Sequence, residues 1–187
     1  VQDENSKKLL EKSKFNNITI SGDTRFDRVY EITQQNNQLN FIEAFTNNKY
    51  TLVAGSTWKE DEELLVDYIN NTASKKEKFI IAPHNINSKD IEQLKSSINK
   101  EVVLYSEKAN VSLKNYQVFI IDTVGILTKI YSYANVAYVG GGFTKTGVYN
   151  VLEPATFGVP IVIGPNYSKF NEAIELVKNK ACFSIGT

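Results

Sequence analysis

Short apolar runs alternate with amphipathic stretches along most of the chain, and this alternation narrows the possible folds more than any other feature. Runs such as Phe79–Ala82 are continuously apolar, which is typical of strands buried on both faces of a parallel sheet. Neighbouring parallel strands need a crossover between them, and the polar stretches after the runs have the spacing of amphipathic helices. The sequence therefore predicts an α/β fold with a doubly wound, mostly parallel, Rossmann-like sheet.

The expected elements follow one another regularly. Strands are expected at Asn17–Ile20, Tyr50–Ala54, Lys78–Ala82, Glu101–Tyr105, Val118–Ile121, Val136–Val139, Pro160–Ile163 and Cys182–Ile185. Helices are expected near Gln2–Lys14, Phe26–Thr33, Gln38–Thr46, Glu60–Asn70, Ser88–Ser97, Val124–Ser132, Asn150–Phe157 and Ser168–Lys178. A length of 187 residues without repeats or low-complexity linkers fits a single domain. Because the chain lacks methionine and stops at Thr187 directly after an expected strand, we expect residues 1–187 to be one domain of a larger protein.

Composition excludes several classes of function. The chain carries 21 basic and 21 acidic residues, so it lacks the electrostatic footprint of a nucleic-acid-binding protein. Its single cysteine, Cys182, forms no internal disulfide and is expected to be a buried strand residue. With one histidine and no Cys/His cluster, we expect neither a metal site nor a cofactor. No apolar run is long enough to span a bilayer and no signal peptide opens the sequence, so we expect a soluble, cytoplasmic chain.

Three successive glycines, Gly140–Gly142, follow the expected strand at Val136–Val139 and precede a helix that begins near Asn150 and carries Glu153. Glycines lack Cβ, so the backbone can approach a ligand closely and direct its N–H groups at phosphate oxygens. The first turn of the helix favours an anion, Asn150 can cap it, and Glu153 can bind ribose hydroxyls. This layout predicts a nucleotide-sugar pocket, and the alternative for the glycines is a tight turn at a sheet edge. The spacing matches neither a Walker loop nor the dinucleotide fingerprint.

Other expected strand ends bring polar residues to the same edge of the sheet, where open α/β sheets bind ligands. The segment Phe157–Pro165 contains a second strand that ends in a Gly-Pro turn. Ser56–Thr57 can either cap the next helix or bind a ligand oxygen, and Asp122–Thr123 have the same two interpretations. The only histidine, His84, directly follows a strand, although a single loop histidine is most often merely solvated.

Seven blocks carry a resemblance to a known family. They are Gly22-Asp-Thr-Arg-Phe-Asp-Arg28, Ala54-Gly-Ser-Thr-Trp-Lys-Glu-Asp-Glu-Glu63, Ala82-Pro-His84, Asp122-Thr-Val-Gly125, Gly140–Gly142, Asn150-Val-Leu-Glu-Pro154 and Gly164-Pro-Asn-Tyr-Ser-Lys-Phe170. In this order the blocks resemble the carboxyl-terminal, donor-binding half of the Kdo transferases. These GT-B glycosyltransferases transfer 3-deoxy-D-manno-octulosonic acid (Kdo) from CMP-Kdo to lipid A precursor in lipopolysaccharide biosynthesis. The resemblance spans nearly the whole chain.

The resemblance implies roles for particular residues. Donor binding would fall to Pro83, His84, Val124, Gly125, Ile126, Gly141, Gly142, Asn150, Val151, Leu152 and Glu153. Arg25 would stabilise charge in the transition state, and its guanidinium suits a departing phosphate. The alternative is a surface arginine paired with Asp23 or Asp27. The resemblance places the general base and the acceptor site in an amino-terminal half, so this chain alone would bind donor without turnover. It also places the parent protein at the cytoplasmic face of the bacterial inner membrane.

The chain departs from the family pattern at several positions. Tyr149 and Trp58 stand where many members have histidine, His84-Asn85 replaces Arg-His, and Ile126 replaces glutamate. An aromatic at position 58 can stack on a base or simply pack. Two further functions remain open at this point. A GT-B glycosyltransferase or epimerase that uses a UDP-sugar would share the glycine turn and the helix-borne glutamate, and the third possibility is a non-catalytic nucleotide-binding or interaction module.

Overall fold

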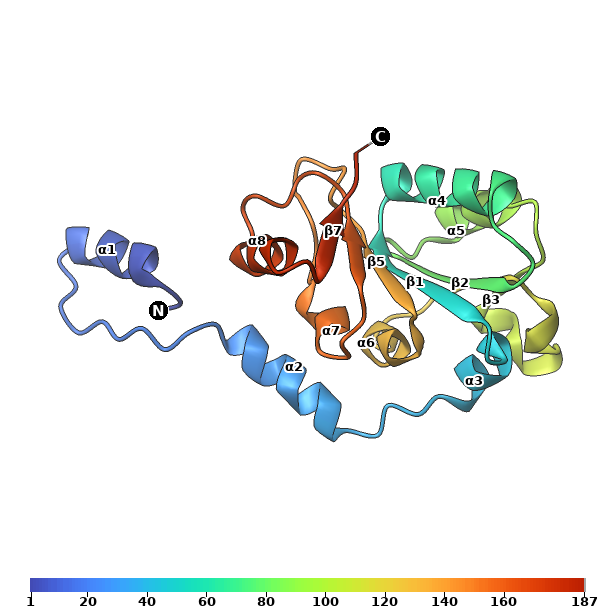
Figure 1. The fold of residues 1–187 in the computed structure, drawn as a ribbon, viewed down its shortest axis with the longest axis horizontal. Helices are drawn as coiled ribbons and strands as arrows, with labels where there is room; N and C mark the ends of the chain where they lie inside the picture. Colours follow the sequence, from blue (N-terminus) through green and yellow to red (C-terminus); the bar gives the residue numbers. More distant parts are fainter. Residues whose placement is uncertain (187) are drawn as a thin grey trace.

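The computed structural model describes residues 1–186, and its centre is a seven-stranded, all-parallel sheet (Figure 1). The strands are β1 (Tyr50–Thr57), β2 (Glu77–Pro83), β3 (Val102–Leu104), β4 (Val118–Ile120), β5 (Val136–Val139), β6 (Ile161–Ile163) and β7 (Cys182–Ser184). Their spatial order is β3-β4-β2-β1-β5-β6-β7. The predicted doubly wound, parallel α/β fold is confirmed.

Helices cover both faces of this sheet (Figure 1). The helices of the described residues are α1 (Glu4–Lys12), α2 (Thr24–Gln34), α3 (Asn40–Thr46), α4 (Lys59–Asn71), α5 (Ser88–Ser97), α6 (Leu127–Ile130), α7 (Leu152–Ala155) and α8 (Asn171–Lys178), with 3-10 turns η1 (Tyr105–Asn110), η2 (Leu113–Asn115) and η3 (Tyr131–Tyr133). All of them except α1 belong to the body of the domain (Figure 1). Along β2, Phe79 and Ile81 pack with α4 and α5, whereas Ile80 packs with α3 and α6. Because successive side chains of a strand point to opposite faces, both faces need apolar residues, which explains the continuous apolar runs.

One predicted strand is wrong and several helices differ from expectation. Residues 17–20, in which polar and apolar residues alternate, lie in a mostly exposed, irregular segment. A segment forms a strand only when another strand pairs with it along its length, and here Thr19 and Ser21 form backbone hydrogen bonds with Val1 instead. Helix α7 covers one turn, Leu152–Ala155, instead of the expected Asn150–Phe157. At its start Pro154 has no N–H that could bond to the Asn150 carbonyl. At its end Phe157 N and Gly158 N donate to carbonyls three residues back, those of Pro154 (3.1 Å) and Ala155 (3.0 Å), so the α-helical pattern stops. The expected helix at Val124–Ser132 is divided into α6 and η3, and the turns η1 and η2 between β3 and β4 were not predicted.

The order of the strands creates a switch point beside β1. From β1 the chain proceeds through β2, β3 and β4 on one side and then crosses to β5, which pairs with the other side of β1. Ligands of open α/β sheets bind outside the carboxyl ends of the strands at such a point. The amino-terminal segment with α1, which has no buried residue, lies apart from the sheet (Figure 1). The predicted domain of residues 1–187 ends at Thr187, outside the described residues.

Candidate functional site

The site begins where β1 ends against the loop that follows β5. Ser56 adopts a left-handed conformation (φ 54°) at a bulge between Gly55 and Thr57. This bulge brings the Ser56 carbonyl against Gly140, where an added Cβ would lie 2.3 Å from the Ser56 oxygen. A non-glycine residue at positive φ is uncommon and is frequently found at functional sites. The two central strands therefore meet in a tight backbone contact at the switch point.

The three glycines are required first by contacts inside the protein. A Cβ on Gly142 would lie 2.6 Å from the backbone nitrogen of Gly164, in the turn after β6. Gly141 has a φ of 90°, a backbone conformation that residues with a Cβ atom rarely adopt. The expected absence of Cβ atoms thus lets three loops pack backbone to backbone, and this packing brings the turns after β1, β5 and β6 together.

Asp61 holds this loop, and it is the residue that sequence reasoning missed. Its carboxylate, fully buried in the first turn of α4, accepts hydrogen bonds from Trp58 N (2.9 Å), from Gly141 N (2.8 Å) and from the Tyr138 hydroxyl. The bond from Trp58 N to the Asp61 carboxylate is one half of a capping box, since Trp58 occupies the N-cap without a side-chain acceptor. The sequence predicted a possible cap at Ser56–Thr57 instead. The contact with Gly141 was not readable from the sequence, because it joins residues 80 positions apart.

Two of the three glycine N–H groups in this loop already donate to acceptors within the protein. Gly140 N donates to Gly55 O at 2.9 Å, and Gly141 N donates to Asp61. Within residues 1–186 no acceptor takes the N–H of Gly142. Of the two glycines predicted to bind substrate, Gly141 donates to a residue of the protein itself, whereas the N–H of the buried Gly142 has no partner among the described residues.

Three aromatic rings cluster at the edge of this contact. The ring centroids of Trp58 and His84 lie 4.7 Å apart at an angle of 18°, which is a stacked pair. Those of His84 and Tyr149 lie 4.5 Å apart at 35°, and those of Trp58 and Tyr149 lie 6.4 Å apart. The Tyr149 hydroxyl and His84 Nε2 are within hydrogen-bond distance at 3.2 Å. The rings come from the ends of β1 and β2 and from the segment before α7, and the fold joins these three residues into one aromatic platform. The Trp58 indole N–H is buried and has no partner among the described residues.

Asn150 and Glu153 lie together at the start of α7. Asn150 precedes the N-cap residue, Val151, so it is not the cap expected from the sequence. Its Oδ1 accepts from Leu152 N at 3.2 Å, and its Nδ2 donates to Glu153 Oε1 at 3.1 Å. The other carboxylate oxygen of Glu153 accepts from Thr128 Oγ1 at 2.9 Å. Val151 and Leu152 are buried and support this turn, which at four residues is too short for the helix dipole invoked from the sequence.

The loop after β4 is open to solvent. Val124 is 81% exposed, and Gly125 has a φ of 90° with no atom near the position of its missing Cβ. Ile126 is half-buried and packs against the core on the α3 side. An exposed valine in the loop after β4, at the carboxyl edge of the sheet, offers apolar surface to a ligand.

Arg25 is held by two carboxylates. Its Nε donates to Asp23 at 2.8 Å, and its Nη1 donates at 2.6 Å to Glu172, a buried residue in the first turn of α8. These hydrogen bonds lower the pKa of Asp23 and raise that of Arg25. The pairing with Asp23 was foreseen as an alternative, whereas the bond to Glu172, which joins α2 to α8, was not. In this structure the guanidinium, 42% exposed at its side chain, acts as a link between helices.

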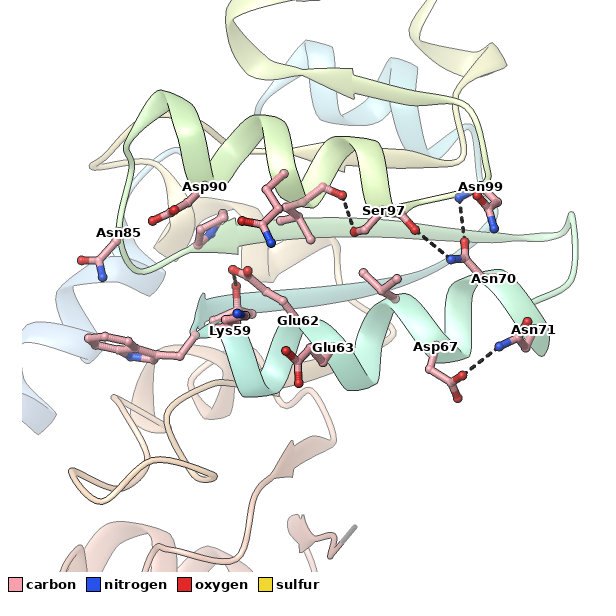
Figure 2. A pocket seen from close by; sticks show the side chains of 16 residues that line it. Lys59, Glu62, Glu63, Asp67, Asn70, Asn71, Asn85, Asp90, Ser97 and Asn99 are labelled. Carbon is pink, nitrogen blue, oxygen red and sulfur yellow. Dashed lines mark hydrogen bonds between the residues drawn. The ribbon is translucent and has the colours of Figure 1, made fainter.

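A cavity of ≈ 540 Å³ lies between α4 and α5 and reaches the site at Trp58 and Pro83 (Figure 2). Figure 2 shows carboxylates along its walls, among them Glu62 and Asp90. Burial raises the pKa of Glu62, and the charges of neighbouring carboxylates add to this effect. Of the predicted site residues only Pro83 lines this cavity. Within residues 1–186, no group of three or more His, Cys, Asp or Glu residues could hold a metal ion, and no helix is long and apolar enough to cross a membrane.

The fold and the switch-point site define the class, a doubly wound domain of the GT-B type. The structure resembles the crystal structure of the C-terminal CMP-Kdo binding domain of WaaA from Acinetobacter baumannii, with a TM-score of 0.65 and 22% sequence identity over 86% of this chain and 81% of that one.

The chain is a homologue of the Kdo transferases, a family of glycosyltransferases. It is 30% identical to 3-deoxy-D-manno-octulosonic acid transferase of Rickettsia prowazekii over 183 residues, which is 92% of this chain and 39% of the relative. It is 31% identical to the enzyme of the same name from Chlamydophila psittaci over 125 residues, 66% of this chain and 28% of the relative. The chain thus spans less than half the length of these relatives. No protein-family model matches it.

Proposed function

We propose that this chain is the donor-binding domain of a Kdo transferase and that it binds CMP-Kdo at the switch point. Homology to Kdo transferases over 92% of the chain supports the choice of family. The observation that carries the position of the site is the aromatic platform, whose Tyr149 ring lies against Gly141, the residue before Gly142, whose N–H is unpaired within the described residues. A flat apolar face next to an unpaired backbone donor suits a nucleobase joined to a phosphate.

The proposed roles follow from the geometry of each group. The exposed side of the His84–Tyr149 pair extends the stack to a pyrimidine ring, and Gly142 N donates to a phosphate oxygen. Glu153, already positioned by Thr128 and Asn150, accepts from a ribose hydroxyl. Val124 covers the sugar from the loop after β4, where its side chain is exposed. These contacts require no metal ion, because the donors are backbone and side-chain N–H groups.

In the full-length protein we propose that transfer of Kdo to lipid A precursor leaves CMP as an anion and that Arg25 stabilises the developing charge. Arg25 must then exchange one of its two carboxylates for the phosphate. The general base and the acceptor site belong to the remainder of the protein, so the domain alone binds donor without turnover. Arg25→Ala is therefore expected to leave CMP binding by this chain unchanged and to slow transfer by the full-length enzyme, and normal turnover would remove this role.

The proposal is tested by calorimetric titration of the chain with CMP, and separately with UMP and UDP as controls. We expect saturable binding that prefers CMP and that weakens about tenfold, or about 1.4 kcal/mol, in His84→Ala. A matched control is His84→Phe, which keeps a ring in the stack and loses only the bond to Tyr149. A preference for UDP would indicate a UDP-sugar enzyme. Absence of binding to all three nucleotides would contradict the assignment of this site.

A further inference from the structure

A second pocket, of ≈ 440 Å³, lies at the amino-terminal edge of the sheet, opposite the proposed donor site. Its described lining contains one carboxylate, Glu101, and five lysines, Lys49, Lys75, Lys78, Lys100 and Lys114. The whole chain has a formal net charge of zero, so this excess of positive charge is local. Such a concentration of one sign of charge in a concave surface attracts ions of the opposite sign.

The topology of the sheet assembles this cluster. Lys49 directly precedes β1, Lys78 is the second residue of β2, and Lys100 and Lys114 lie in the segments that enter β3 and β4. These strands are neighbours in the order β3-β4-β2-β1 and run parallel, so the segments that enter them converge at one edge. Lysines that are separated in the sequence by up to 65 positions, from Lys49 to Lys114, thereby share one pocket.

Lys78 is the unusual member, because its side chain is buried in a pocket of like charge. The residue is 2% exposed, and its ammonium donates to the carbonyl oxygens of Lys114 (2.9 Å) and Tyr116 and lies 4.7 Å from the Phe45 ring centroid. Burial lowers the pKa of Lys78 to about 8, and the charge of Lys49 adds to this effect. Within residues 1–186 none of the five pocket lysines forms a salt bridge with a carboxylate. A buried cation without a counter-charge is costly, and an anion in the pocket offsets that cost.

Two further lysines are held in place by backbone carbonyls. Lys49 Nζ donates to Lys75 O at 3.1 Å, and Lys100 Nζ donates to Asn70 O at 3.4 Å. An ammonium has three donors, so each of these groups keeps N–H bonds for a ligand. Because these contacts restrict the two side chains, binding an anion costs less side-chain entropy than it would at lysines without such contacts.

We propose that this pocket binds a phosphate group of multiple negative charge, either free in solution or as the headgroup of a lipid. Phosphate oxygens accept hydrogen bonds from several ammonium groups at once, and their charge matches the pocket better than a single carboxylate does. The proposal rests on the lysine cluster alone and is independent of the nucleotide bound at the opposite edge of the sheet.

The test compares the parent chain with a variant that lacks two exposed pocket lysines, Lys49→Gln/Lys114→Gln. The charge-matched control is Lys8→Gln/Lys12→Gln on the exposed helix α1. Inorganic pyrophosphate is titrated calorimetrically at low salt, and flotation is measured with phosphatidylcholine vesicles that contain or lack phosphatidic acid. We expect the pocket variant to bind at least about tenfold more weakly, a loss of about 1.4 kcal/mol, and the control to bind like the parent chain.

Binding of pyrophosphate that depends on the pocket lysines would support a soluble ligand, and binding only to vesicles with phosphatidic acid would support a lipid headgroup. Binding of neither probe would overturn the proposal, as would equal weakening by the two variants. CMP titration of the pocket variant separates the two sites. The Lys49→Gln/Lys114→Gln variant is expected to bind CMP like the parent chain, whether or not the lysine pocket binds phosphate.

Discussion

The Asp61 carboxylate accepts a hydrogen bond from the backbone N–H of Gly141 at 2.8 Å and so ties the first turn of α4 to the loop after β5. The same carboxylate accepts from Trp58 N and from the Tyr138 hydroxyl, and it is fully buried. All three described partners of Asp61 donate hydrogen bonds to its carboxylate oxygens. A side chain with an N–H group at this position would therefore find no acceptor among them. Asp61 thus connects the start of the aromatic platform to the glycine loop.

Asp61→Asn tests this connection. The amide introduces a donor among three donors, and we expect the free energy of unfolding to fall by about 1–3 kcal/mol. Urea denaturation measures the change. Glu63→Gln, an equivalent change at an exposed position of the same helix, should alter stability by less than about 0.5 kcal/mol. Equal stability of the two variants would show that the buried carboxylate is not needed.

Gly140→Ala tests the close contact between the ends of β1 and β5. The new Cβ would lie 2.3 Å from the Ser56 carbonyl oxygen and 2.7 Å from Thr57 Cα, both of them backbone atoms that move only with their strands. We expect a loss of about 3 kcal/mol or more in unfolding free energy, at the upper end of overpacking effects. At Gly186, where no atom lies near the missing Cβ, the same substitution should be close to neutral. A stable Gly140→Ala chain would contradict the contact.

Glu153→Ala is expected to weaken CMP binding about tenfold without unfolding the domain. The carboxylate is only half-buried, and its described partners are two side chains, those of Thr128 and Asn150. Calorimetry gives the affinity and circular dichroism the folded fraction, with Glu175→Ala, an exposed change on α8, as control. Unchanged affinity for CMP would remove Glu153 from the proposed site.

Arg25→Ala is expected to destabilise the chain because it leaves Glu172 buried without its partner. The cost should be about 1–2 kcal/mol, less than for a fully buried pair, since the Arg25 side chain is 42% exposed. The double variant Arg25→Ala/Glu172→Gln should recover part of the loss, because it removes the unpaired charge. A double-mutant cycle by chemical denaturation measures the coupling, and strictly additive effects would show that the pair contributes nothing.

The stability of the chain is expected to rise with pH above about 8 because of Lys78. Its folded-state pKa is lowered to about 8 from the ordinary 10.5, so between these values the unfolded chain holds a proton that the folded chain has released. Below about pH 8 Lys78 is protonated in both the folded and the unfolded chain, so the buried charge lowers the free energy of unfolding by its full amount. Lys78→Met should flatten this part of the curve. Identical slopes for parent and variant, from denaturation at a series of pH values, would contradict the assignment to Lys78.

Seven of the eight expected strands form, because their continuous apolar runs report burial on both faces, a local property of the sequence. Asn17–Ile20, where polar and apolar residues alternate, was also expected to be a strand. It is not one, because no other strand among the described residues pairs with it. The extent of α7 was also misjudged. Pro154 cannot donate to the Asn150 carbonyl, and after Ala155 the backbone bonds span three residues instead of four. The eleven residues assigned to donor binding and Arg25 remain predictions for the experiments above.

By itself the sequence determined the class of the sheet and the positions of most elements, because hydrophobic periodicity and glycine turns are local features. It also determined the family, because the order of the motifs can be read directly from the sequence. Only the tertiary structure decided that β5 pairs with β1 and that β3 lies beyond β4. That order brings the rings of Trp58, His84 and Tyr149 together, joins Asp61 to the glycine loop by a hydrogen bond and gathers five lysines at the opposite edge. The physical reason is that hydrophobic periodicity specifies how each strand is buried, whereas the choice of neighbours depends on packing between residues far apart in the chain.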